Sequence, residues 1–551
     1  MSLPDFSPQS TLFTTLTPEF FGPKDSYRLF GQKVYPALVQ ARAALQKAYC
    51  PDNGRPATEP LLLAGVTLLQ FVEGVPDRQA VEMLHYHLGW NFALNRTAGT
   101  PPFHPTTLVH FGQRLIDHDL SPVVFGQLLA ALQQAGLVER RGKQRLDSTQ
   151  VLGLVSRMSR LECMRETLRL ALQELAQSTV LFAKPAWWEG LVERYVSSKL
   201  DYRTEASVLQ EKMKQAGADA WMIVQWVKKL SDDTVAQGLQ CQLLERVLGE
   251  NFTGADSGVT EPTPAQPAGA VHNPHDAQAQ WAAKGQGKHK KEHVGYKVQV
   301  AESVVTEPLA KGEPTRSFIT GMATQPAIAS DEAGAEQIQK EQADMGLEKP
   351  SELYVDGAYI SGEKLAQAHA EGRELIGPAQ AAPQYGHRFS SEDFQVRVEE
   401  RQALCPAGKP STQCSRLEEK ETGAVSYRFE WSYHCKACPL RAQCVGAGQA
   451  HRSLVVGQHH TELQTRRQEQ KTETFAKKSR RRNAIEGTQS ELVRGHGLRH
   501  ARYRGLEKNR LQNYFIGAAC NAKRWIRRMR WEMRQGQIGA KLSPVSSGAG
   551  A

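Results

Sequence analysis

The chain has 551 residues, too many for one compact core, so two or more domains are expected. Hydrophobic residues make up 40% and charged residues 23%, which is ordinary for a globular protein, and the net charge of +10 hints at a polyanionic partner. Apolar stretches such as residues 61–72 are too short to span a bilayer, and no leader pattern follows Met1. No membrane partner is therefore expected, and a cytoplasmic location is predicted.

Helices are predicted over residues 20–136. Apolar residues recur there at spacings of three and four, as in the run Leu61, Leu62, Leu63, Val66, Leu68, Leu69, Phe71 and Val72. The pattern is typical of a helical bundle. Whether this bundle also binds DNA or mediates dimerisation is left open by the sequence.

A strand carrying an acid comes next. Residues 145–155 have the apolar and β-branched pattern of a strand, with Asp147 within it. Helical spacing returns over residues 156–250. Residues 253–275 are rich in Gly, Pro, Ala and Thr, which predicts a linker.

An alternation of strands and helices follows the linker. We expect strands at 294–301, 316–322, 352–356 and 374–377, and helices at 331–345 and 362–372. The third of these strands ends at Asp356. Together with the Asp147 strand, this predicts a mixed α/β sheet, in which ligands collect at the ends of central strands. Asp147 and Asp356 would meet there if their strands are neighbours.

The stretch 477–534 is predicted to be helical and strongly basic. It contains 17 Lys or Arg residues against four Glu, a surplus larger than the net charge of the whole chain. Such a concentration of positive charge favours nucleic-acid binding. Trp525 and Trp531 lie among its arginines and could stack on bases or simply pack. Beyond it, the tail from Gly536 is expected to be disordered.

One helix in this basic stretch carries a third acid. Arg482, Glu486 and Ser490 share a helix face, and Arg494 lies two turns beyond Glu486. Asp147, Asp356 and Glu486 together offer the hard oxygen ligands that Mg²⁺ or Mn²⁺ prefers. Two such ions can activate a water and stabilise a leaving oxygen in phosphodiester cleavage. The arginines beside the acids could hold phosphate through paired hydrogen bonds.

Taken together, these motifs resemble those of a known protein family. The ordered motifs of the chain are similar to those of DDE insertion-sequence transposases with an RNase H-like catalytic core, and closest to the insertion-sequence 1182 branch. The matching residues are Gly54-Arg-Pro-Ala57, Leu69-Gln70, Pro76-Asp-Arg78, Pro102-Phe103-His104-Pro-Thr-Thr107, Asp147-Ser-Thr149, Gly295-Tyr-Lys297, Asp356-Gly-Ala-Tyr359, Glu486-Gly487, His496-Gly-Leu-Arg499, Ala501-Arg-Tyr-Arg-Gly505 and Asn521. The resemblance runs from about Phe20 to Arg528.

The resemblance implies a function and a site. Asp147, Asp356 and Glu486 would be the metal-binding catalytic triad of a DNA transposase that cuts at terminal inverted repeats and transfers strands into target DNA. Related enzymes often carry a Tyr-x2-Arg-x3-Glu-x6-Lys signature. This chain keeps Arg482 and Glu486 but has Ser479 and Val493 in the Tyr and Lys places.

Partners and rival functions follow from the same resemblance. The expected partners are double-stranded DNA, at element ends and target, and a second copy of the chain, with no membrane; a nucleoid-associated, bacterial-type setting is implied. One alternative is a non-catalytic, zinc-stabilised DNA-binding protein derived from a transposase. Another is a nuclease of the same fold that cuts without joining.

The resulting fold prediction is an α/β RNase H-like core, a mixed sheet flanked by helices, with a helical N-terminal domain and helical and cysteine-rich insertions. The expected segments are 1–136 for the N-terminal DNA-binding or dimerisation domain, 137–155 for the first part of the core, 156–275 for a helical insertion and linker, 276–385 for the central core, 386–470 for a cysteine-rich insertion, 471–535 for the basic helical end of the core and 536–551 for a disordered tail.

Five of the nine cysteines cluster before Glu486. In a cytoplasmic protein they are better interpreted as thiols or metal ligands than as disulfides. Cys405, Cys435, Cys438 and Cys444 are the preferred set for a structural Zn²⁺, with Cys414 or His434 as a possible replacement for one member. A reduced cluster that packs without metal is the alternative. The remaining cysteines, Cys50, Cys163, Cys241 and Cys520, are expected to be buried thiols.

A second basic group leads into the strand at Val294. It consists of Lys284, Lys288, Lys290, Lys291 and Lys297. These lysines could contact the DNA backbone, or they could form a solvated loop. Together with Arg482, Arg494 and Arg499, we expect Lys284 and Lys297 to bind DNA.

Overall fold

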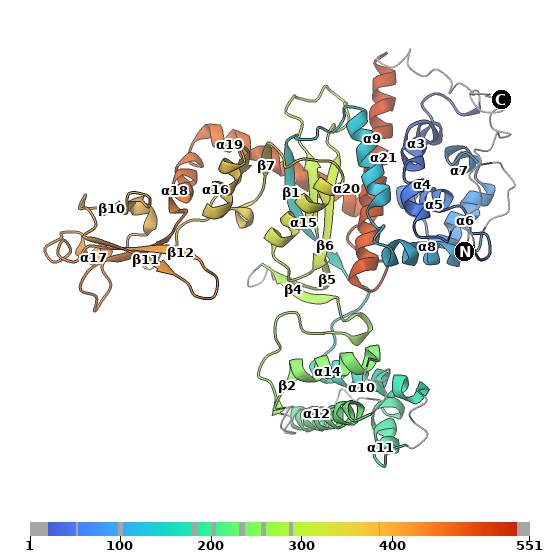
Figure 1. The fold of residues 1–551 in the computed structure, drawn as a ribbon, viewed down its shortest axis with the longest axis horizontal. Helices are drawn as coiled ribbons and strands as arrows, with labels where there is room; N and C mark the ends of the chain where they lie inside the picture. Colours follow the sequence, from blue (N-terminus) through green and yellow to red (C-terminus); the bar gives the residue numbers. More distant parts are fainter. Residues whose placement is uncertain are drawn as a thin grey trace.

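A mixed six-stranded sheet lies at the centre of the structure, a computed structural model (Figure 1). The structure describes residues 20–50, 53–96, 103–178, 184–199, 205–230, 237–254, 261–285, 290–384 and 386–536. The tail predicted to be disordered lies outside the described residues, apart from Gly536. Among the described helices, none is both long and apolar enough to cross a membrane.

The strand order places the strand of Asp147 in the middle of the sheet. The strands are β1 (Gln144–Leu152), β4 (Gln280–Lys284), β5 (Lys291–Ser303), β6 (Ile319–Pro326), β7 (Glu352–Tyr354) and β8 (Glu374–Ile376). Their order is β4-β5-β1-β7-β8, with β6 also pairing β5. β1 runs antiparallel to β5 and parallel to β7, and β7 runs parallel to β8. The predicted mixed sheet is confirmed, and it is consistent with an RNase H-like core.

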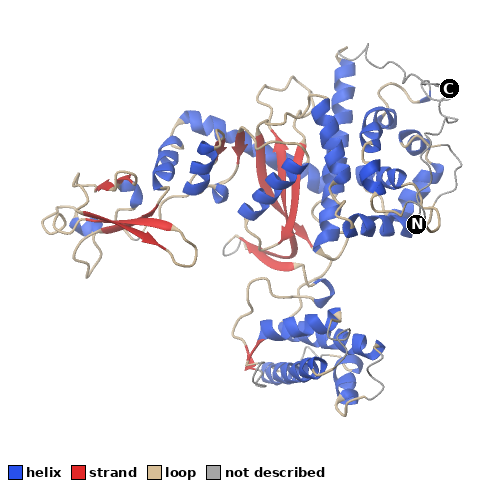
Figure 2. Cartoon of the chain, viewed as in Figure 1, coloured by secondary structure: helices blue, strands red, loops and turns tan. Residues whose placement is uncertain are grey.

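Helices cover both faces of this sheet because its strands alternate apolar side chains between two cores. Leu146 and Ala301 pack on one face in a cluster with Ile338 of α15 (Asp331–Asp344) and Ala368 of α16 (Gly362–Ala370). The opposite face packs against α20 (Ala484–His496) and α21 (Leu506–Arg534), as Figure 2 shows. Asp147 lies four residues before Val151 on β1, and side chains an even number of residues apart on a strand point to the same face. Because Val151 packs on this second face, Asp147 belongs to it as well.

The N-terminal region is helical, as predicted, and it packs directly on the sheet domain. Its elements are α2 (Ser26–Leu29), η1 (Phe30–Val34), α3 (Tyr35–Val39), α4 (Arg42–Gln46), α5 (Pro60–Glu73), α6 (Asp77–Tyr86), α7 (Leu88–Ala93), α8 (Thr106–Asp117) and α9 (Val123–Gln134). Phe71 of α5 stacks on Phe515 of α21 with ring centroids 5.7 Å apart. One hydrophobic cluster runs from these helices through α21 to β5 and β6.

A second helical unit hangs from the sheet between β1 and β4 (Figure 1). It contains α10 (Arg160–Gln177), α11 (Trp188–Val192), η3 (Glu193–Ser197), α12 (Ala206–Lys228) and α14 (Leu239–Asn251). Ser159 and Glu162 form a capping box at the start of α10. The unit has its own hydrophobic cluster. The short pair β2 (Phe252–Thr253) and β3 (Glu261–Pro262) and the turn η5 (Pro274–Asp276) lie in the predicted linker.

A third unit projects on the far side of the sheet, at the left of Figure 1. It contains β9 (Gln395–Arg397), β10 (Gln402–Leu404), β11 (Gln413–Glu418), β12 (Val425–Glu430), α17 (Arg441–Cys444) and β13 (Ser453–Gly457). Trp431 and Phe429 are wholly buried in its own cluster. α18 (His460–Glu469), α19 (Glu473–Ser479) and η9 (Arg480–Asn483) then return the chain to α20.

Three sequence expectations are corrected in detail. The strand expected at 316–322 begins at Ile319 and runs to Pro326, because its pairing with β5 starts only there. β7 ends at Tyr354, so Asp356 follows the strand and caps the short helix η7 (Gly357–Tyr359). Cys50 is exposed rather than buried, whereas Cys163, Cys241 and Cys520 are buried as expected.

Candidate active site

Asp147 and Asp356 lie side by side although 209 positions separate them. The parallel register pairs Gln144 with Leu353 and Arg145 with Tyr354. Continuing that register by two residues places Asp147 opposite Asp356, where β7 has just ended. The sequence could predict the two strands but not their pairing.

Arg482 joins the two carboxylates. One guanidinium nitrogen, Nη2, donates to Asp147 Oδ2 at 2.8 Å and lies 3.8 Å from Asp356 Oδ2. The Arg482 Nε is buried and has no hydrogen-bond partner among the described residues. The guanidinium is therefore held by the acid pair through Nη2, while its buried Nε is left without a partner among the described residues.

The Asp147 carboxyl group is partly buried and lies close to several charged groups. Burial raises its pKa above the usual range, and the nearby charge of Asp356 acts in the same direction. Arg482, the backbone N–H of Ser148 and Lys284 oppose this rise. A second carboxylate and a partly buried position together favour the binding of a cation.

Glu486 is the third predicted acid, and it lies in the first turn of α20. Gln489, three residues later, donates from Nε2 to the carbonyl oxygen of Ser148 at 3.2 Å. One face of α20 therefore lies against β1 just beyond Asp147. Glu486 itself is exposed, and the ligand oxygens of the three acids do not all lie within 4.8 Å of one another. The structure brings Asp147 and Asp356 together and leaves Glu486 exposed in the first turn of α20.

The donor set fits Mg²⁺ or Mn²⁺. Asp147 and Asp356 supply adjacent hard oxygen ligands, which these ions prefer. A cationic side chain already lies between them, so the position attracts positive charge. Glu486 stands on the helix that faces this position.

The predicted DNA-binding side chains have different surroundings. Lys284 is exposed at the end of β4, directly opposite Lys291 on β5. Arg494 is exposed in the last turn of α20. Arg499 donates to the carbonyl of Gln150 at 3.0 Å, alongside β1. Lys297 forms an ion pair with Asp331 at 2.9 Å, and its side chain is only 14% exposed. It is therefore turned toward the protein rather than toward solvent.

The other lysines of the basic group before β5 also differ in their surroundings. Lys290 forms an ion pair with Glu292 and lies over the ring of Trp281, and Lys291 is exposed. Lys288 lies outside the described residues. Trp525 is buried in the main hydrophobic cluster, so it packs rather than stacking on bases.

The preferred cysteines lie around one small pocket in the projecting unit. Its lining includes Cys405, His434, Cys435, Cys438 and Cys444. Burial raises the pKa of the Cys444 thiol to about 11, Arg452 opposes this rise, and the three other cysteines add to it. The ligand atoms of this set do not all lie within 4.8 Å of one another.

Cys414 lies elsewhere, because it pairs with Phe429 across β11 and β12 and does not line the pocket.

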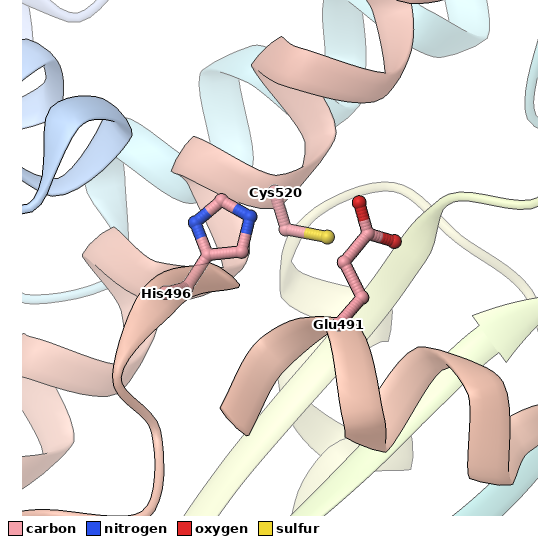
Figure 3. A group of neighbouring side chains, drawn as sticks. All are labelled: Glu491, His496 and Cys520. Atoms are coloured by element: carbon pink, nitrogen blue, oxygen red, sulfur yellow. The ribbon is translucent and has the colours of Figure 1, made fainter. Parts of the chain in front are cut away.

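A different trio of potential metal ligands is closer together. Figure 3 shows Glu491, His496 and Cys520 pointing toward one another from α20 and α21, and their ligand atoms all lie within 4.8 Å. Arg524 and Arg527 already bind the Glu491 carboxylate, at 2.8 Å and 2.7 Å. Burial and the nearby Lys523 lower the pKa of His496 to about 4. With these cations beside it, the trio is better suited to packing α20 on α21 than to holding a metal ion.

Comparison with known proteins identifies two matching family models. Residues 404–526 match a transposase DDE domain, and residues 19–114 match a transposase domain known as DUF772. The two matches indicate a DNA transposase. No curated protein matches the chain. The DDE match contains Glu486 and the clustered cysteines, whereas Asp147 and Asp356 lie outside it, so their assignment rests on the geometry above.

The buried charges beneath the Asp147–Asp356 pair could not be predicted from the sequence. Glu302 is wholly buried and forms ion pairs with Arg145 at 2.6 Å and with Arg524 at 2.5 Å. The sequence offers one indication of this network: Glu302 is an acidic residue near the end of β5, among apolar residues. Its partners could not be identified, because they lie 157 and 222 positions away.

Proposed function

We propose that this chain is a DDE transposase of the insertion-sequence 1182 branch that cuts DNA at the terminal inverted repeats of its element and joins the ends to target DNA. Asp147, Asp356 and Glu486 are the proposed ligands of Mg²⁺ or Mn²⁺. The observation that carries the proposal is the parallel pairing of β1 and β7, which sets Asp147 beside Asp356 with Arg482 between them.

The proposed chemistry has two in-line displacements. In the first, a water oxygen attacks a phosphorus atom at the element end and the 3′-oxygen leaves, which produces a 3′-hydroxyl. In the second, that 3′-hydroxyl attacks a target phosphodiester and displaces another 3′-oxygen. Bound divalent ions would activate the attacking oxygen and stabilise the leaving one. Arg482, which lies between the two acids, and Arg494, which is exposed in the last turn of α20, are the proposed ligands of phosphate oxygens.

DNA is the proposed partner, and Lys284 is proposed to contact its backbone. Lys284 and Lys291 face each other across β4 and β5, an arrangement of like charges that a polyanion would relieve. Lys284 also acts electrostatically on Asp147. Arg499 is a further proposed contact. Two copies of the chain are proposed to hold the two element ends.

The catalytic proposal is tested by strand-specific cleavage of DNA that carries the element ends, with Mg²⁺ or Mn²⁺. Asp147→Asn, Asp356→Asn and Glu486→Gln should each lower the cleavage rate by at least about 1,000-fold. Asp344→Asn, which changes an exposed acid at the end of α15, is the matched control and should cleave like the wild type. Full activity in one of the three variants would remove that residue from the triad.

The same assay separates the rival functions. Cleavage without joining, measured by strand transfer into plasmid DNA, would point to a nuclease. Specific DNA binding without metal-dependent cleavage by the wild type would point to a non-catalytic DNA-binding protein. Either result would overturn the transposase proposal.

We also propose a structural Zn²⁺ held by Cys405, Cys435, Cys438 and Cys444. The support is that these four side chains line a common pocket in a unit with a small core of its own. Purified protein should contain about one zinc per chain by mass spectrometry of metals, and Cys438→Ser should lower that content. Cys414→Ser is the matched control and should retain the metal. Zinc-free wild-type protein with an intact projecting unit would contradict the proposal.

A further inference from the structure

Glu302 is a wholly buried carboxylate at which three elements of the active-site region meet. It lies near the end of β5, opposite Arg145 of β1 in the antiparallel register. Its Oε2 accepts from Arg145 Nε at 2.6 Å, and its Oε1 accepts from Arg524 Nη1 at 2.5 Å. A buried carboxylate is costly unless it is paired and hydrogen-bonded, and this one is both.

The helix that carries Glu486 is attached to this carboxylate. Thr488 of α20, two residues after Glu486, donates from its hydroxyl to Glu302 Oε1 at 2.6 Å. Arg524 of α21 in turn donates to the Thr488 hydroxyl at 2.9 Å and forms an ion pair with Glu491 at 2.8 Å. Thr488 and Arg524 are themselves 4% and 2% exposed. These contacts fix α20 on the sheet from its buried side.

The strand that carries Asp147 is attached to the same carboxylate. Arg145 precedes Asp147 by two residues and points to the same face of the sheet. Besides Glu302, its guanidinium donates to the carbonyl of Arg481 at 3.3 Å and to the Ser317 hydroxyl at 3.3 Å. Arg481 immediately precedes Arg482, which bridges the two aspartates. The network therefore connects the strand of Asp147 to the segment that carries Arg482 and Glu486.

From this arrangement we infer that Glu302 is a positioning residue, which holds α20 where Glu486 can complete the metal site of Asp147 and Asp356. The inference rests on the proposed function. Buried ion networks add little net stability over well-packed apolar side chains. In this structure such a network fixes the distance between β1 and α20, which are far apart in the chain: their contact residues Ser148 and Gln489 are separated by 341 positions. Glu302 touches none of the three acids and acts through Arg145 and Thr488.

The most conservative test removes the attachment of the helix alone. Thr488→Val keeps the shape of the side chain and leaves the Glu302–Arg145 pair in place. Mn²⁺ binding to the full chain is measured by electron paramagnetic resonance, without DNA. We expect the Mn²⁺ Kd to rise about 10-fold, the size typical of changes to groups that orient metal ligands. Glu302→Gln, which also loosens Arg145, should raise it at least as much.

A double-mutant cycle distinguishes positioning from general loosening. If Thr488 acts through Glu486, then Thr488→Val should change the Mn²⁺ Kd little when Glu486→Gln is already present. Equal effects in both backgrounds would overturn the inference. So would an unchanged Kd in a folded Thr488→Val protein.

Asp219→Asn is the control for a merely structural role. Asp219 is another buried carboxylate, bound by Arg194 and by the Tyr195 hydroxyl in the separate helical unit. Its replacement should lower the melting temperature and leave the Mn²⁺ Kd unchanged; a matching rise would attribute the Thr488 effect to lost stability. Because metal binding is measured directly, a wild type that binds Mn²⁺ but fails to cleave DNA would count against the proposed function and not against the role of Glu302.

Discussion

At the scale of single residues, the candidate site is a pair of acids with a cation already between them. Arg482 offsets the charge of Asp147 and Asp356 when no metal is bound. The same guanidinium is the proposed ligand of a DNA phosphate. In the proposed site, one side chain would thus both compete with a metal ion and contact the DNA.

Replacing Arg482 should separate these two effects. In Arg482→Gln the competing charge is gone, so we expect tighter Mn²⁺ binding, by about 1 kcal/mol or roughly fivefold in Kd for a partly exposed ion pair. Calorimetric titration of the metal-free chain measures it. Arg494→Gln, an exposed change on the adjoining helix, should leave the Kd unaltered. Equal affinity in wild type and Arg482→Gln would show that the guanidinium does not compete.

His496 should make the protein sensitive to acid. Burial, followed by Lys523, lowers its pKa to about 4 when folded, against about 6.5 in an unfolded chain. The unfolded state therefore takes up the proton first as the pH falls, so stability is complete above about pH 6.5 and is lost progressively toward pH 4. The groups facing the ring are Glu491, Cys520, Lys523, Arg524 and Arg527.

The measurement is urea unfolding of wild type and His496→Gln at pH 7.5 and pH 5. The wild type should lose about 2 kcal/mol more than the variant between these two values. His387→Gln, an exposed histidine, should behave like the wild type. A parallel pH dependence in His496→Gln would show that this histidine does not control acid stability.

At the scale of elements, the close pairing of β1 and β5 determines where Asp147 lies. Gly295 lies on β5 opposite Leu152, and a Cβ added there would come within 2.1 Å of the Val151 carbonyl oxygen. Only glycine allows this approach, which explains the glycine in the motif Gly295-Tyr296-Lys297.

Gly295→Ala should therefore force the two strands apart. We expect a loss of about 1–3 kcal/mol in the free energy of unfolding, as for overpacked cores, together with weaker Mn²⁺ binding because β1 moves. Thermal unfolding and metal titration measure the two effects. Gly249→Ala, in α14, meets no atom within 4 Å and should be neutral or stabilising. A Gly295→Ala protein as stable as the wild type would refute the steric argument.

Much of the element order could be predicted from the sequence, because it depends on local pattern. The alternation in Val294–Ala301 and the helical spacing in 331–345 both correspond to observed elements, β5 and α15. The start of β6 could not be predicted, because it depends on where β5 offers a partner. Glu302 was missed for the same reason, since its role depends on Arg145, Thr488 and Arg524, which only the folded chain brings near it.

At the scale of the whole molecule, the basic C-terminal stretch is less free to bind DNA than its composition indicates. Several of its cations form ion pairs within the protein: Lys478, Arg482, Arg510, Arg524, Arg527 and Arg528. A count of charges in the sequence therefore overstates the number available for phosphates. Lys477 and Arg480 are exposed at the approach to α20 and remain candidates.

The salt dependence of DNA affinity should reveal which cations contact phosphate. Replacing both Lys477 and Arg480 with Ala should reduce the slope of log K against log salt by about 2, because each phosphate contact contributes about 0.9. Fluorescence anisotropy with end-bearing DNA over a range of salt concentrations measures the slope. Lys184→Ala, which changes an exposed lysine of the separate helical unit, should leave it unchanged. An identical slope in the double variant would place DNA elsewhere.

The position of helix α21 at the end of the chain has a consequence for when the site can form during synthesis. It packs against α5 and α9 from the first part of the chain, against β6 of the sheet, and through Arg524 against Glu302. While the ribosome is still making residues 506–534, Asp147 and Asp356 have long been synthesised, but the support beneath α20 is missing. The partly made chain should therefore be unable to cut DNA, and any shortened product lacking this helix should be inert as well. If the chain cleaves DNA as proposed, the order of synthesis would delay that reaction until the last helix is complete.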